Sequence, residues 1–88
     1  MYLGKVTGTV VSTSKQEGLV GCKLLVVERL TPELKGTDET AIAVDTVGAG
    51  VGVIVIVATG SSARQVAAKE RAPVDAAIVG IVDEVELG

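Results

Sequence analysis

Two segments, one rich in glycine and one with paired serines and an arginine, are the first places to look for chemistry in this chain. One of them is VGAGVG, at residues 47–52, whose glycines are spaced like part of a phosphate-binding loop. Dinucleotide folds place G-x-G-x-x-G directly before a helix, so that the helix N-terminus meets the pyrophosphate. Here the spacing is G-x-G-x-G, and the aliphatic run VIVIV that follows is typical of a strand. The glycines therefore indicate a tight turn or a close backbone approach.

The second segment is GSSAR, at residues 60–64, which brings two hydroxyls and a guanidinium to the start of a predicted helix. One interpretation is an anion site, because free backbone N–H groups at a helix start attract anions. The other is structural: Ser62 and Gln65 form an S-x-x-Q capping box, and Arg64 pairs across an interface. We favour the structural interpretation. A serine nucleophile is not predicted, since the chain has no histidine to act as its base.

The remaining reactive side chains do not form a recognisable catalytic or metal-binding set. Cys22 lacks a histidine partner and is expected to behave as a small hydrophobe. The acidic pairs Asp38–Glu39 and Asp83–Glu84 lack the spacing of a calcium loop. Asp45 and Asp83 each follow an apolar run, where an acid usually ends a strand, but the sequence leaves open that they meet in space. We predict no catalytic residue, no metal site and no cofactor.

Composition argues against nucleic acid and membranes as partners. The 88 residues carry a net charge of −3, from 8 basic and 11 acidic residues without a basic stripe. With one tyrosine, no phenylalanine and no tryptophan, the chain also lacks rings on which bases stack. No window reaches the roughly 20 apolar residues that span a bilayer, and no export signal is recognisable at the N-terminus. We therefore expect a cytoplasmic protein.

The pattern of the chain predicts a single domain, residues 1–88, that is mainly β. Short runs rich in valine and isoleucine alternate with turn residues, and helix-forming residues follow Gly60. Residues 31–40 are expected to form an exposed loop. The predicted fold is a small five-stranded OB-like β-barrel with one short helix, because closure removes the edges of a small sheet. The expected strands are residues 3–13, 22–30, 40–45, 51–59 and 75–87.

The amount of apolar surface predicts an oligomer. Hydrophobic residues make up 48% of the chain, and the strand at 51–59 is aliphatic on both faces. A domain of this size buries only roughly 60–65% of the surface that its unfolded chain exposes. Some of the apolar surface is therefore expected to meet another subunit.

Five segments in order then identify the chain as similar to a known family. They are GTVVST with Lys15, GCKLLVVE, AVDTVGAGVG, GSSAR and PVDAAIVGIVDEV, which begin at residues 8, 21, 43, 60 and 73. In order and spacing they resemble the bacterial microcompartment vertex family, also called the EutN/CcmL family. GSSARQ and VGIVDEV favour the ethanolamine- or propanediol-type compartments. Val53 departs from the family pattern, which commonly has an acid there, and the chain stops at DEVELG where several relatives have a longer tail.

The resemblance implies a structural shell protein that is not an enzyme. Members form pentameric rings that close the vertices of a cytoplasmic microcompartment shell, which is otherwise tiled by hexameric shell proteins. It also implies two sets of contact residues. Those expected at the five-fold axis or pore are Asp45, Val47, Gly48, Ala49 and Gly50. Those expected at the subunit interface are Ser12, Thr13, Lys15, Ser62, Arg64 and Gln65. An alternative function is an OB-like module that binds single-stranded nucleic acid, motivated by the barrel alone.

Overall fold

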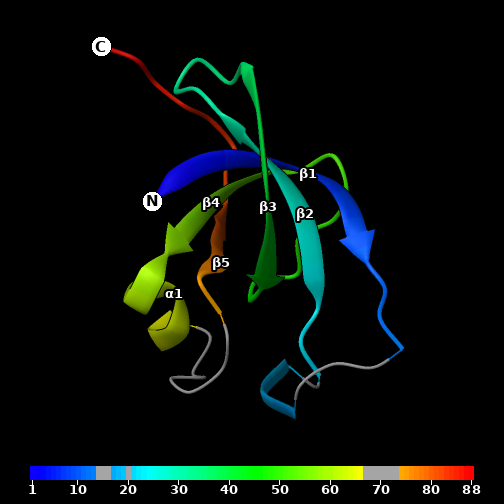
Figure 1. The fold of residues 1–88 in the computed structure, drawn as a ribbon. Coiled ribbons are helices and arrows are strands. Elements are labelled where there is room, and N and C mark those ends of the chain that lie inside the picture. Colours follow the sequence, from blue (N-terminus) through cyan, green and yellow to red (C-terminus); the bar gives the residue numbers. More distant parts are fainter. Residues whose placement is uncertain (14–16, 20, 67–73) are drawn as a thin grey trace.

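The computed structural model describes residues 1–13, 17–19, 21–66 and 74–88. Its strands close into a five-stranded barrel with the neighbour order β1-β2-β3-β5-β4, and β4 pairs back onto β1 (Figure 1). All neighbouring strands are antiparallel except β3 and β5, which run parallel. The predicted fold class is confirmed. The elements are β1 (Tyr2–Val10), a 3-10 turn η1 (Glu17–Leu19), β2 (Leu24–Leu30), β3 (Gly36–Asp45), β4 (Ile54–Thr59), α1 (Gly60–Val66) and β5 (Ala76–Ile81).

The barrel interior is filled by aliphatic side chains from alternate strand positions. Along β2 and β4, burial alternates, as expected when one face of a strand lines a core. The largest fully buried side chains are Leu25, Ile78, Val6, Val27, Val55 and Val57. β-branched residues suit this position because their stiff side chains pack well on a pleated surface.

A second, smaller apolar cluster lies outside the barrel, under α1. Ala63 of the helix packs with Val44 of β3, Ala77 of β5 and the buried Val74. Cys22 is half-buried against this cluster, which agrees with its predicted role as a small hydrophobe. The helix lies mainly against β5 and β4, and this cluster fills the space beneath it.

The second half of the segment predicted as an exposed loop is instead strand. β3 begins at Gly36, which pairs with Leu30, and Thr40 pairs with Glu28. The polar residues that suggested a loop are tolerated because this end of the hairpin is exposed, and backbone pairing does not depend on burial. The turn between the strands is limited to residues 31–35, which we call the hairpin tip. The Thr31 N–H donates to the Lys35 carbonyl at 2.8 Å and closes it.

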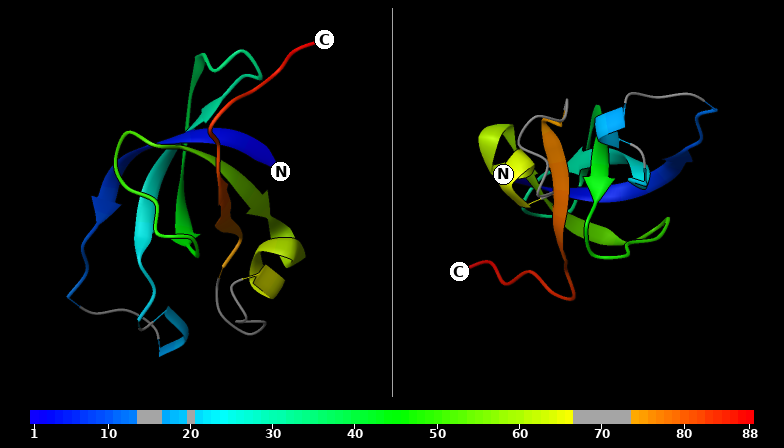
Figure 2. Two further views of the ribbon diagram at one scale, coloured as in Figure 1. Left: turned by 180° about the vertical axis from the view of Figure 1, so that it is seen from behind. Right: turned by 90° about the horizontal axis from the view of Figure 1, so that it is seen from below.

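Other predicted boundaries also move. β1 ends at Val10, three residues early, and β4 begins at Ile54 because residues 51–53 complete a structured loop. β5 ends at Ile81, and residues 82–88 leave the barrel as an extended tail (Figure 2). The helix begins at Gly60, so Ser62 lies in the first turn, and its prediction as the N-cap is wrong. Within the described ranges, no helix is long and apolar enough to cross a membrane.

Candidate functional site

The glycine segment forms the β3–β4 loop, residues 46–53, and its shape is fixed by one carboxylate. The Asp45 side chain accepts hydrogen bonds from the backbone N–H groups of Val47 at 3.1 Å, Gly48 at 3.1 Å and Ala49 at 3.0 Å. An ionised carboxylate makes such bonds stronger than neutral ones. Asp45 is also the last residue of β3, as predicted from its position after an apolar run.

Further contacts hold the same loop against the barrel. Ala49 is only 1% exposed and belongs to the barrel core, and its carbonyl accepts a hydrogen bond from Lys23 Nζ at 3.1 Å. Thr46 Oγ1 donates to the Ile78 carbonyl at 2.6 Å, and the Gly52 N–H donates to the Val6 carbonyl at 2.8 Å. The loop is therefore a structured part of the barrel wall. Val53, the residue that departs from the family pattern, lies at the end of this loop and packs against the barrel core.

Two of the loop glycines are required by backbone conformation, and one is not. Gly48 has a φ of 79° and Gly52 a φ of 92°, in the region that only glycine adopts readily. Gly50 has no positive φ, and a Cβ added there would meet nothing within 4 Å. Among the residues that the structure describes, nothing explains why residue 50 is a glycine.

The predicted axis residues therefore come together in one loop but face different ways. Asp45 is half-buried and Ala49 is buried, so these two shape the loop from inside. Val47, Gly48 and Gly50 lie on its exposed side, and Val51, which the sequence did not single out, is 64% exposed. The surface available for contact is made of small and aliphatic groups.

The predicted interface residues do not come together within one chain. Ser12 and Thr13 are exposed and directly follow β1, while Ser62 is exposed on α1. Figures 1 and 2 show the end of β1 and the helix on opposite sides of the barrel. Lys15 lies outside the described residues. Arg64 and Gln65 belong to α1, but their side chains are not among those that the structure describes. The interpretation of GSSAR as an anion site therefore stays a prediction.

Two apolar outer faces also lie on different strands of the barrel. The first, the β1–β4 outer face, consists of the half-buried Leu3, Ile54 and Ile56, where Leu3 pairs with Ile56. The second, the β2–β3 outer face, consists of Val26 and its partner Ile42, which is 48% exposed. Aliphatic side chains on the solvent side of a small barrel are typical of contact surfaces.

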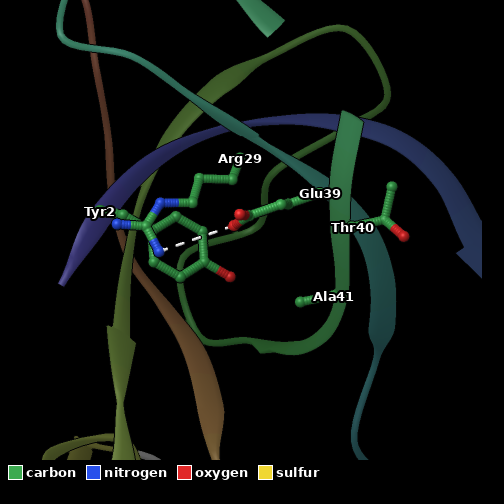
Figure 3. Close-up of a pocket in the computed structure, with 5 residues that line it drawn as sticks. All are labelled: Tyr2, Arg29, Glu39, Thr40 and Ala41. Carbon is green, nitrogen blue, oxygen red and sulfur yellow. Dashed lines mark ion pairs between the residues drawn. The ribbon is translucent and has the colours of Figure 1, made fainter. Parts of the chain in front are cut away.

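A shallow charged pocket lies where β1 and the β2–β3 hairpin meet, lined by Tyr2, Arg29, Glu39, Thr40 and Ala41 (Figure 3). The Arg29 guanidinium lies over the Tyr2 ring, 4.9 Å from its centroid, and its Nη1 is 3.8 Å from Glu39 Oε2. Burial, supported by the negative charges of Asp75 and Glu39, raises the pKa of the Tyr2 phenol, while Arg29 opposes the shift. The phenol therefore stays protonated at neutral pH and is no general base.

The acidic residues considered in the sequence do not assemble into a site. Asp45 pairs with Ile78 of β5, and Asp83 comes five residues later, beyond the end of that strand. Five extended residues span roughly 16 Å, so the two carboxyl groups do not meet. In the part of the chain that the structure describes, no three histidine, cysteine or acidic side chains are grouped so that they could hold a metal ion.

With this geometry in place, comparison with known proteins decides the family. Residues 1–83 match the family model described as "Ethanolamine utilisation protein EutN/carboxysome". The chain belongs to the EutN/CcmL family. It is 65% identical over 86 residues to the bacterial microcompartment shell vertex protein GrpN of Rhodospirillum rubrum (strain F11), covering 98% of this chain and 97% of that protein. To the shell vertex protein EutN of Escherichia coli (strain K12) it is 46% identical over 88 residues, covering 100% and 93%.

The EutN/CcmL assignment extends to solved structures. The structure titled "GrpN pentameric microcompartment shell protein from Rhodospirillum rubrum" superposes with a TM-score of 0.91, at 62% identity and full coverage of both chains. The chain is accordingly a structural shell vertex protein and not an enzyme. The EutN relative supports the predicted link to ethanolamine- or propanediol-type compartments. None of these relatives is named as a nucleic-acid-binding protein, so the alternative function gains no support.

Proposed function

We propose that five copies of this chain form a closed ring that caps the vertices of a microcompartment shell, surrounded there by hexameric shell proteins. The pentameric title of the GrpN structure supports the ring size, because that chain and this one match over their full lengths. The protein's place in the cell is then a shell in the cytoplasm.

The observation that carries the proposal is the separation of the predicted interface residues. A ring with five-fold symmetry uses a heterologous contact, in which one patch of each subunit meets a different patch of the next. β1, which Ser12 and Thr13 follow, ends on the side of the barrel opposite α1, the helix that contains Ser62, Arg64 and Gln65 (Figure 1). In a ring, the first side of one copy faces the second side of its neighbour, and Lys15 joins this contact.

The two apolar outer faces fit the same arrangement. The β1–β4 outer face and the β2–β3 outer face belong to different strand pairs, so each is available to a different neighbour. Burying them between copies removes aliphatic surface from water, at roughly 25 cal/mol per Å². This accounts for the hydrophobic content that a monomer of 88 residues does not bury.

The exposed side of the β3–β4 loop is proposed to lie at the five-fold axis. Five copies of a loop converge only if their side chains are small, and Gly50 is small for no reason within its own chain. Gly48 adds a second position without a side chain, and Val47 lines the same exposed side. Asp45 and Ala49 hold the loop in shape from behind.

Cysteine crosslinking tests the heterologous contact. In a Cys22→Ala background, one variant carries Ser12→Cys together with Ser62→Cys, and two control variants carry only one of these changes. A short bis-maleimide should give a ladder of covalent species up to five copies with the double variant, and no ladder with either control. Crosslinking of a single variant to dimers would point to a two-fold contact and contradict the ring.

A further inference from the structure

The hairpin tip contains a residue whose backbone conformation does not suit it. Leu34 has a φ of 66°, in the left-handed region. Asp38, a few residues on, has a φ of 65°, but aspartate tolerates this region because its short polar side chain bonds locally. A bulky apolar residue there is an outlier, and glycine or asparagine would be favoured.

The Leu34 side chain gains little from its own fold in return. It is 42% exposed and belongs to neither apolar cluster of the described residues. The turn itself is closed by backbone hydrogen bonds, from the Leu34 N–H to the Thr31 carbonyl and from the Thr31 N–H to the Lys35 carbonyl. Strained residues persist where a function requires them, so the leucine side chain needs a partner outside the chain.

The hairpin tip lies apart from the residues that were predicted for the subunit interface. The β2–β3 hairpin projects from one end of the barrel, while α1, the end of β1 and Asp45 lie toward the other end (Figure 1). β3 joins the hairpin tip to Asp45 through ten residues, a span of roughly 30 Å. Leu34 therefore lies apart from α1 and from the end of β1, the two regions that carry the predicted interface residues, which leaves its side chain available to a partner outside the ring.

The charge around Leu34 narrows the chemistry of that partner. Near the hairpin tip the sequence places Glu33, Asp38 and Glu39 against two cations, Lys35 and Arg29, of which Arg29 pairs with Glu39 at 3.8 Å. The tail that leaves the same end of the barrel adds acidic residues and no basic ones (Figure 2). A complementary surface has an apolar recess with lysine or arginine beside it. The acidic residues of the tail are Asp83, Glu84 and Glu86.

We propose that Leu34 is the anchor by which the ring docks onto a neighbouring shell protein, inserting into an apolar recess bordered by basic side chains. The inference rests on the proposed ring, because it assigns Leu34 to the boundary between the ring and the surrounding shell.

The test compares Leu34→Gly with Leu34→Met, which keeps an apolar side chain of similar size. Each ring is measured for melting temperature, for mass by native mass spectrometry, and for affinity to a purified hexameric shell protein of the same compartment. Leu34→Gly should melt roughly 4–8 °C higher, because the strain is relieved, and keep the ring mass. Its affinity should fall at least about tenfold, while Leu34→Met binds like the wild type.

Several outcomes overturn the proposal. The first is that Leu34→Gly binds the hexameric shell protein as tightly as the wild type does. The second is that this variant melts no higher than the wild type. The third is that the wild-type ring does not bind the hexameric shell protein. If Leu34→Gly no longer forms the ring, the leucine side chain lies between subunits of one ring. If the wild type forms a ten-copy species that this variant lacks, the partner of Leu34 is a second ring. Failure of the ring proposal itself is distinguishable, because the wild-type protein alone would then lack the five-copy mass.

Discussion

The two ends of β3 lead into turns that are built in opposite ways. At one end, the β3–β4 loop is held by the Asp45 carboxylate, by the buried Ala49 and by glycines at positive φ. At the other, the hairpin tip is closed by backbone hydrogen bonds and places Leu34 at positive φ with an exposed side chain. The residue types in the first turn suit their backbone conformations, whereas Leu34 in the second does not.

This difference separates the residues that the fold of one copy explains from those that it does not. In the loop, Asp45, Gly48 and Ala49 are explained by the fold of a single copy, and Gly50 is not. In the hairpin tip, the unexplained residue is Leu34. The proposals above assign these two residues to contacts of different kinds, Gly50 to the five-fold axis and Leu34 to a neighbouring shell protein.

The largest effect on the chain should come from Asp45→Ala. The change removes three hydrogen bonds to a charged acceptor, and partial exposure lets water replace some of them. We expect a loss of about 2–3 kcal/mol in the free energy of unfolding, measured by urea denaturation. Asp45→Asn keeps one oxygen acceptor and should lose less. Equal stability of Asp45→Ala and the wild type would mean that the loop is not held by this side chain.

Two glycine variants separate chain stability from ring formation. Gly48→Val forces a β-branched residue to positive φ and should cost about 1–3 kcal/mol in the folded chain. Gly50→Val meets open space, so the chain should fold with the wild-type circular dichroism spectrum while the ring is lost. Gel filtration with light scattering measures the second effect. An intact Gly50→Val ring would remove this loop from the five-fold axis.

A smaller effect is expected at the charged pocket beside the hairpin. Arg29→Ala removes a contact with the Tyr2 ring and a 3.8 Å ion pair whose side chains are both half or more exposed. Each contact is worth about 0.5–1 kcal/mol or less, so the unfolding free energy should fall by about 1 kcal/mol. Arg29→Lys, which keeps the charge, serves as the control. If Arg29→Ala lowers the unfolding free energy as much as Asp45→Ala does, the contacts of Arg29 stabilise the fold as strongly as the Asp45 hydrogen bonds, which would contradict this ranking.

The smallest effect is a pH dependence at high pH. Because the folded chain raises the pKa of Tyr2 above 10.0, the unfolded chain loses its phenolic proton first as the pH increases. Stability from this group is present below pH 10.0 and is lost as the pH rises through the folded pKa. Tyr2→Phe should therefore show a shallower fall in stability between about pH 9 and pH 11. Identical profiles would contradict the assignment.

The sequence predicted the barrel because its signals are local and repeated. Runs of valine and isoleucine mark the strands around Leu25 and Val55, and alternation follows from the pleat. The boundaries near Gly36 could not be predicted, since pairing with Leu30 stabilises a polar strand that composition assigns to a loop. The start of the helix was misplaced because Ser62 fits a capping box that the backbone does not use.

The structure locates the candidate contact residues, while their contacts with other subunits stay predictions. The family motif located the β3–β4 loop, but only the structure separates the inward Asp45 and Ala49 from the exposed Gly50. The hairpin was missed, because leucine is not a turn residue and no motif marks Leu34 as a residue with positive φ. The contact of Arg29 with Tyr2 joins distant parts of the chain and has no sequence signal.

The central claim is that five copies close around the exposed side of the β3–β4 loop, and native mass spectrometry tests it most directly. The wild-type protein at micromolar concentration should appear as one species with five times the 8.9 kDa chain mass. The Gly50→Val variant, folded to the same extent, should appear mainly as single chains. A wild-type protein that is monomeric, dimeric or a ring of another size would contradict the account.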